Sequence, residues 1–132
     1  MSSSGPSRIV YIVDGDASVR EGLARLMDAA GLEPRPCVSV EEFLTMVQKV
    51  PSACVLLDLP GVWDCEASVR TLLFAVAGRL PVIALSSFDS PDDRRRAREM
   101  GARHFFRKPV DATALLDSIE WVAYNDGRDV PH

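Results

Sequence analysis

The chain has 132 residues and a formal net charge of −4, a length sufficient for one domain with a buried core. The acidic balance gives no electrostatic basis for direct binding to nucleic acid or to an anionic membrane, and no apolar run reaches the length of a membrane span. Three cysteines without C-x-x-C spacing favour a reducing, cytoplasmic location and argue against a disulfide framework or a zinc site.

The first third of the chain predicts two strands separated by a helix. Residues 1–7 are rich in serine and lack an apolar core, so they are interpreted as a disordered lead-in. Residues 9–13 form a β-branched run, and the apolar residues within 17–30 recur at helical spacing. Residues 32–38 contain two prolines, which cannot donate to a strand ladder, so this strand is expected at a sheet edge.

The middle of the chain contains the longest buried-strand pattern. A capping box at 39–42 starts a short helix that is expected to end at 51–52. The run 53–59 is apolar up to a single aspartate, which predicts a strand covered on both faces. Residues 60–63 are then expected to form a tight loop, and 64–77 a helix capped by its first residue, an aspartate.

The last third repeats the alternation. Residues 81–85 predict another buried strand, and 90–100 a helix with serine as cap, proline in its first turn and acids beside it. Residues 103–106 predict a short strand, and the last helix follows a cap at Asp111. The polar residues 125–132 are expected to be a flexible tail.

Five strands alternating with five helices predict an α/β domain over residues 8–124 with a parallel sheet and helices on both faces. The proline-bearing second strand suits an edge position. The expected fold is therefore flavodoxin-like, a doubly wound (βα)5 unit with strand order 2-1-3-4-5.

Polar side chains follow four of the predicted strands, and parallel strands all end at the same edge of their sheet. These residues are Asp14 and Asp16 after the first strand, Asp58 after the third, Ser86 after the fourth and Lys108 after the fifth. Neighbouring carboxylates can hold a hard divalent cation, and a lysine with a hydroxyl suits a phosphoryl group. A carboxylate can also be the nucleophile that forms an acyl phosphate.

Over nearly its whole length, the chain resembles the receiver domain of two-component response regulators. The residues that carry the resemblance are Val13-Asp14-x-Asp16, Leu57-Asp58, Ser86-Ser87 and Phe105-x-x-Lys108-Pro109. Each motif alone is weak, and the ordered set on the appropriate strand ends is specific.

The resemblance implies a signalling receiver rather than an enzyme. Asp58 is expected to take a phosphoryl group from a histidine kinase or a phosphotransfer protein. Mg²⁺ is expected to be held by Asp14, Asp58 and the backbone carbonyl of Pro60, with Asp16 as a further candidate that is favoured more as a helix cap.

The same resemblance assigns the phosphate contacts and the switch. Lys108 and Ser86 are expected to contact the phosphoryl oxygens, with Phe105 as the switch aromatic, and the Lys108–Pro109 peptide is expected to be cis. Phosphorylation would change binding to a downstream protein or output domain. Homodimerisation through the fourth and fifth helices is left open.

Two features depart from the family pattern. Gly15 stands where the family has a second acid, and the loop after Asp58 is shortened, with Pro60 earlier than in the family. Both are expected to weaken Mg²⁺ binding. The alternative function is therefore a degenerate receiver that acts as a protein-interaction module without phosphorylation.

Two other functions, nucleic-acid binding and flavin transport, are disfavoured by the sequence. The run Arg94-Arg95-Arg96 is interpreted as the solvated face of a helix that also carries acids, in preference to a nucleic-acid patch. A flavodoxin-like flavin carrier is disfavoured because no Ser/Thr-rich phosphate loop follows the first strand.

Overall fold

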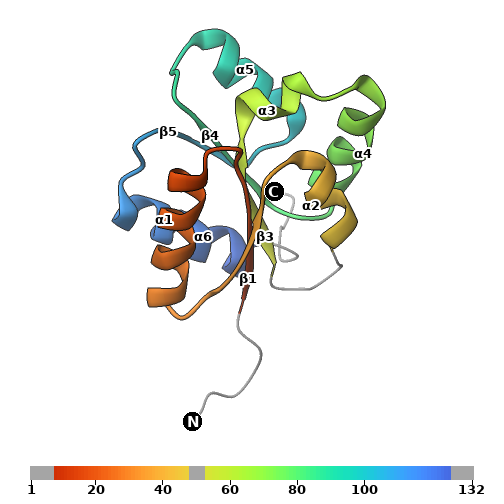
Figure 1. Ribbon diagram of the computed structural model, residues 1–132. Helices are drawn as coiled ribbons and strands as arrows, with labels where there is room; N and C mark the ends of the chain where they lie inside the picture. Colours follow the sequence, from red (N-terminus) through yellow and green to blue (C-terminus); the bar gives the residue numbers. More distant parts are fainter. Residues whose placement is uncertain (1–7, 48–52, 126–132) are drawn as a thin grey trace.

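The computed structural model describes residues 8–47 and 53–125 and forms one parallel sheet with the order β2-β1-β3-β4-β5 (Figure 1). This order confirms the predicted flavodoxin-like topology. The strands are β1 (Ile9–Val13), β2 (Glu33–Cys37), β3 (Cys54–Asp58), β4 (Val82–Ser86) and β5 (His104–Arg107).

Helices cover both faces of the sheet, as Figure 1 shows. They are α1 (Ala17–Ala29), α2 (Val40–Met46), α3 (Leu59–Asp64), α4 (Ala67–Ala77), α5 (Pro91–Met100) and α6 (Ala112–Asn125). Buried residues of α1 and α6 pack with one set of strand side chains, and those of α2, α3, α4 and α5 pack with the other set. Because successive strand residues point to opposite faces, one apolar run supplies both cores.

The edge position of β2 is confirmed. This strand pairs with β1 alone, and its two prolines lie opposite Val10 and Ile12. An edge strand bonds on one side only, so the missing proline N–H groups face away from the ladder.

The expected tight loop at 60–63 is wrong, because this segment is helical. Helix α3 begins directly after Asp58, with Pro60 in its first turn, where a missing N–H is tolerated. Leu59 and Val62 lie on one face and are fully buried. The burial of this apolar face explains why a helix replaces the expected turn.

The next helix starts later than predicted. Helix α4 begins at Ala67 after Glu66, which makes no side-chain cap, so Asp64 ends α3 instead of capping α4. The described part of the chain therefore has six helices where five were expected.

The other helix starts agree with the predicted caps. The Ser39 hydroxyl accepts from the Glu42 N–H at 3.1 Å, and the Ser90 hydroxyl accepts from the Asp93 N–H at 3.1 Å. The Asp111 carboxylate likewise starts α6 by accepting from the Ala114 N–H at 2.9 Å. These bonds satisfy backbone donors that have no partner within a helix.

Two predicted features fall wholly or partly outside the described residues: the lead-in at 1–7 and most of the tail. The helix that was expected to end at 51–52 ends earlier, at Met46, because the backbone of Val47 is already extended. Asn125, expected to begin that tail, is the last residue of α6. Among the helices that the structure describes, none is both long enough and apolar enough to cross a membrane.

Candidate functional site

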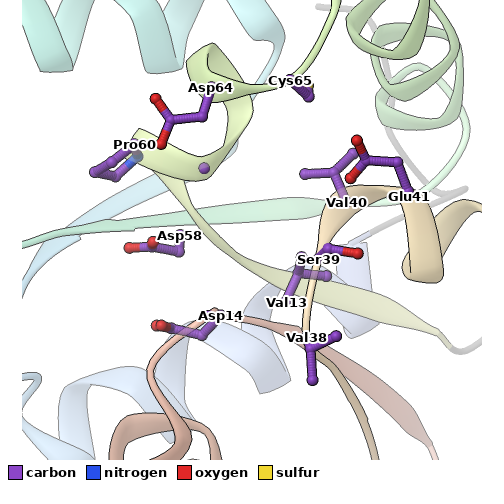
Figure 2. Close-up of a pocket in the computed structure, with 12 residues that line it drawn as sticks. Val13, Asp14, Val38, Ser39, Val40, Glu41, Asp58, Pro60, Asp64 and Cys65 are labelled. Carbon is purple, nitrogen blue, oxygen red and sulfur yellow. The ribbon is translucent and has the colours of Figure 1, made fainter.

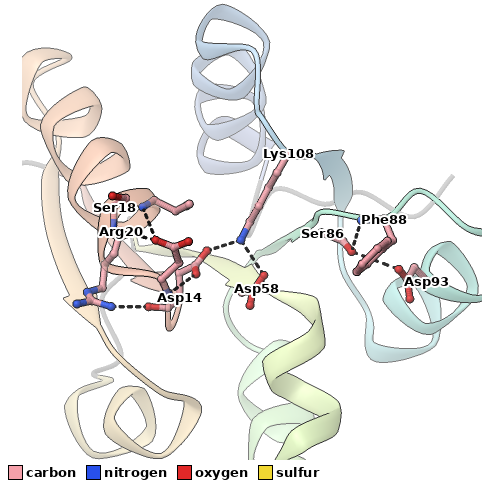
Figure 3. A network of polar contacts seen from close by, with 10 residues as sticks. Asp14, Ser18, Arg20, Asp58, Ser86, Phe88, Asp93 and Lys108 are labelled. Atoms are coloured by element: carbon pink, nitrogen blue, oxygen red, sulfur yellow. Dashed lines mark hydrogen bonds and ion pairs between the residues drawn. The ribbon is translucent and has the colours of Figure 1, made fainter.

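The carboxyl edge of the sheet joins Asp14, Asp58 and Lys108 in one ion-pair cluster. The Lys108 Nζ donates to Asp14 Oδ2 at 2.6 Å and to Asp58 Oδ1 at 2.9 Å (Figure 3). Asp58 is the last residue of β3, whereas Asp14 and Lys108 directly follow β1 and β5. Three segments that are distant in sequence thus place two carboxylates and one ammonium group together.

Backbone contacts hold Asp14 firmly in this cluster. Its N–H donates to the Cys37 carbonyl at 3.2 Å, and its carbonyl accepts from the Arg20 guanidinium at 2.7 Å. Asp14 Oδ1 accepts from the Asp16 N–H at 2.9 Å. The side chain is only 3% exposed, so the Asp14 carboxylate depends on the Asp16 N–H and on Lys108 to stabilise its charge.

Burial and neighbouring charges shift the pKa values of both Asp58 and Lys108. Burial raises the pKa of Asp58, and the nearby Asp14 raises it further, although the hydrogen bond from Lys108 acts in the opposite direction. Burial lowers the pKa of Lys108, but its hydrogen bonds to Asp14 and Asp58 outweigh burial and leave that pKa raised. Lys108 therefore stays protonated, and the ionised form of Asp58 is held at an energetic cost.

We expect Asp58→Asn to raise the melting temperature by a few degrees at neutral pH. Because the pKa of Asp58 is raised in the folded protein, the contribution of this group to stability is fully present at pH values below its pKa in the unfolded chain. It is lost as pH rises through the folded pKa, and a neutral asparagine avoids that loss.

Thermal unfolding at neutral and mildly acidic pH checks this expectation, since the difference should shrink as Asp58 becomes protonated. Asp64→Asn is the control, because this exposed carboxylate lines the same pocket. A lower melting temperature for Asp58→Asn at neutral pH would show that pairing with Lys108 outweighs burial.

Ser86 lies at the end of β4, but its hydroxyl is directed toward α5 (Figure 3). The hydroxyl donates to Asp93 Oδ2 at 3.2 Å and accepts from the Phe88 N–H at 3.1 Å. The Ser86 carbonyl accepts from the Lys108 N–H at 2.8 Å. The backbone of Ser86 is therefore hydrogen-bonded to Lys108 of the cluster, whereas its side chain is hydrogen-bonded to Asp93 of α5.

Phe105 lies in β5 and packs, half-buried, against the core on the α5 side. The Arg94 guanidinium lies 4.9 Å from the centroid of its ring. The peptide bond between Lys108 and Pro109 is cis.

The remaining metal-site candidates are less favourably placed. Asp16 caps α1, and its Oδ1 accepts from the N–H groups of Ser18 and Val19. Pro60 lies in α3, where helical carbonyls align with the helix axis and accept from residues further along the helix. Across residues 8–47 and 53–125, no group of three or more His, Cys, Asp or Glu side chains is arranged to hold a metal ion.

A pocket of about 310 Å³ lies beside Asp14 and Asp58. Figure 2 shows Pro60 and Asp64 of α3 on one side of it and Asp14 on the other, with Asp58 between them. Glu41 of α2 also lines the pocket. No sequence pattern indicated Glu41 or Asp64, because tertiary packing alone brings α2 and α3 to this edge.

The pocket suits a hydrated cation better than a fully protein-ligated one. Mg²⁺ commonly retains several waters and takes one or two carboxylates together with phosphate oxygens. Asp14 and Asp58 offer two such carboxylates at the pocket wall. A Cβ atom added at Gly15 would meet only the Val38 carbonyl, at 3.8 Å, so a side chain at this position meets no close contact.

Comparison with known proteins gives a consistent result. The sequence model of the response regulator receiver domain matches residues 10–120. The chain is 29% identical over 118 residues to the transcriptional regulatory protein TdiR of Thauera aromatica, covering 89% of this chain and 52% of that protein. It is 30% identical over 113 residues to nodulation protein W of Bradyrhizobium diazoefficiens, covering 84% and 49%. The chain thus spans about half the length of these curated relatives.

Solved structures show the same fold. The response regulator StyR superimposes with a TM-score of 0.77 at 30% identity, covering 93% of this chain and 62% of that one. A CheY-like receiver domain protein from Methanospirillum hungatei gives a TM-score of 0.79 over 95% of this chain and all of the other. At 19% identity, this second likeness concerns the fold alone.

Proposed function

The chain belongs to the response regulator receiver domain family, and we propose that it accepts a phosphoryl group on Asp58 from a histidine kinase or a phosphotransfer protein. The observation that carries the proposal is the Lys108 ammonium group, which bridges Asp14 and Asp58 at 2.6 and 2.9 Å. This arrangement places a positive charge where a phosphoryl group on Asp58 would carry negative charge.

The transfer is a displacement at phosphorus. An Asp58 carboxylate oxygen forms the new O–P bond while the P–N bond to the donor histidine breaks, and the imidazole nitrogen retains the electron pair. Oδ1 is engaged by Lys108. Oδ2 accepts no hydrogen bond from the residues that the structure describes, and it lies on the side of Gly61 in α3. Oδ2 is therefore the oxygen that is free to attack.

Lys108 has a role before and after transfer. It offsets the repulsion between Asp14 and Asp58 in the unmodified protein, and its raised pKa keeps it charged. When Asp58 becomes an acyl phosphate, Nζ is close enough to pair with phosphoryl oxygens. Asp14 and Asp58 would hold Mg²⁺, which when bound neutralises charge on the phosphoryl oxygens.

Two features make the proposed Mg²⁺ affinity low. Gly15 supplies no carboxylate, and the Pro60 carbonyl belongs to the first turn of α3. Asp16 remains a candidate ligand, although its carboxylate already caps α1.

The output is proposed to be a change in binding to a downstream protein or an output domain. Homodimerisation through the predicted fourth and fifth helices, which are α5 and α6 in the structure, is a further proposal. It is supported by Trp121 of α6, which is 52% exposed.

Phosphoryl uptake from acetyl phosphate with saturating Mg²⁺ tests the proposed function. Intact-protein mass spectrometry should show one phosphoryl addition for the wild type and for the control Asp64→Asn, and none for Asp58→Asn. An unmodified wild type would instead support the degenerate receiver, in which Gly15 and α3 abolish metal binding.

A further inference from the structure

The first turn of α5 contacts Ser86, which is expected to bond the phosphoryl group, and Phe105, which is expected to be the switch aromatic. Asp93 accepts the hydrogen bond of the buried Ser86 hydroxyl at 3.2 Å. The next residue, Arg94, places its guanidinium 4.9 Å from the centroid of the Phe105 ring. Two consecutive side chains of one turn thus hold Ser86 and Phe105.

We propose that Asp93 is a positioning residue that competes with a phosphoryl group on Asp58 for the hydroxyl proton of Ser86. In the unmodified protein Asp93 holds that hydroxyl toward α5, and phosphorylation must displace it. The inference rests on the proposed phosphorylation of Asp58 and adds a residue that sets how readily the phosphorylated state forms.

The competition follows from the hydrogen-bonding capacity of serine. A hydroxyl has one proton to donate, so it cannot bond Asp93 and a phosphoryl oxygen together. Ser86 is 0% exposed, which leaves no bulk water to replace a lost partner. The present bond goes to a carboxylate and, at 3.2 Å, is longer than a typical hydroxyl–carboxylate bond, so a phosphoryl oxygen can compete for the proton.

The backbone of Ser86 is held beside the acceptor strand and the cluster. The register pairs Leu85 with Asp58, so Ser86 lies one residue beyond the acceptor on the neighbouring strand. The Lys108 N–H fixes the Ser86 carbonyl at 2.8 Å beside the cluster. Rotation of the hydroxyl away from Asp93 is therefore the change that would direct it toward the acceptor site.

The turn that holds Asp93 also has a fixed backbone. The Asp93 N–H donates to the Ser90 hydroxyl at 3.1 Å, so removal of the Asp93 side chain leaves the helix cap in place. Asp92 is a matched neighbour: it lies in the same first turn, is exposed, and pairs with Arg95 at 3.2 Å without contacting Ser86. Alanine at either position removes the same charge near the helix N-terminus.

The test measures the steady-state ratio of phosphorylated to unmodified protein at subsaturating acetyl phosphate with Mg²⁺. Asp93→Ala should raise this ratio about three- to tenfold. This is the effect of losing one hydrogen bond to a charged group, reduced because Asp93 is partly exposed to solvent. Asp92→Ala should leave the ratio within about twofold, because the shared effect on the helix dipole is small. Asp93→Asn keeps an oxygen acceptor and should lie between the wild type and Asp93→Ala.

A double-mutant cycle separates positioning from a general effect on the fold. In a Ser86→Ala background, Asp93→Ala should no longer change the ratio, because the contested proton is absent. Thermal unfolding verifies that each variant is folded, with Asp93→Asn as the milder change.

An equal effect of Asp93→Ala with and without Ser86, or no effect at all, would overturn the competition while leaving the proposed function intact. If the wild type takes up no phosphoryl group, the proposed function itself fails, and the competition fails with it.

Discussion

Replacing Lys108 by methionine is expected to lower the free energy of unfolding at neutral pH by about 2–4 kcal/mol, somewhat less than the full cost of breaking a buried pair. Lys108 Nζ is the shared donor to Asp14 and Asp58. The side chains of Asp14 and Lys108 are 3% and 14% exposed, so little solvent replaces the lost charge. Asp58 is 21% exposed, which moderates the effect.

The loss should depend on pH in a defined direction. Without the ammonium group, the hydrogen bond that lowers the pKa of Asp58 is lost, so burial and the neighbouring Asp14 raise that pKa further. Groups with raised folded pKa values contribute stability that is complete below their unfolded pKa and is lost as pH rises through the folded pKa. The difference between Lys108→Met and wild type should therefore shrink in mild acid.

Chemical denaturation across this pH range provides the measurement. Arg107→Met is the matched control, because it removes a positive charge from the preceding, exposed residue. A destabilisation that is independent of pH, or equal in the two variants, would indicate that Lys108 acts through packing instead of charge.

Gly15→Asp is expected to tighten Mg²⁺ binding about tenfold or more, since affinity for hard cations rises with the number of charged oxygen ligands. Gly15 lines the pocket that Asp14 and Asp58 also line. Its φ is not among the positive values, which belong to Gly31 and Gly101 within the described residues. An added side chain therefore meets neither backbone strain nor a close contact.

Calorimetric titration with Mg²⁺ checks this effect, with Gly15→Asn as a control of equal size and no charge. An unchanged affinity in Gly15→Asp would indicate that α3 limits Mg²⁺ binding, because Pro60 and its carbonyl lie in that helix. In the absence of metal, the extra acid should slightly destabilise the fold through repulsion with Asp14.

The sheet and most helix starts were predictable because their signals are local. The uninterrupted apolar runs identify strands that are covered on both faces, and residues such as Ser90 mark helix starts directly. The segment after Asp58 was mispredicted for the same reason. A Pro-Gly pair is a strong local turn signal, whereas the burial of Leu59 and Val62 that forms α3 depends on the tertiary structure.

The candidate site was predictable only in part. Strand topology sufficed to bring Asp14, Asp58 and Lys108 to one edge, and the structure places Lys108 in direct contact with both carboxylates. The direction of the Ser86 hydroxyl and its bond to Asp93 depend on a rotamer and on the docking of α5. No pattern along the chain encodes such features.

The most direct test of Asp58 as the acceptor is to locate the phosphoryl group after incubation with acetyl phosphate and saturating Mg²⁺. Borohydride reduces an aspartyl phosphate to homoserine, so the modified residue can be read by mass spectrometry of the tryptic peptide 50–70. We predict that Asp58 alone is converted, and that conversion is lost in Asp58→Asn. Conversion of another carboxylate in place of Asp58, or no conversion in the wild type, would contradict the proposed function.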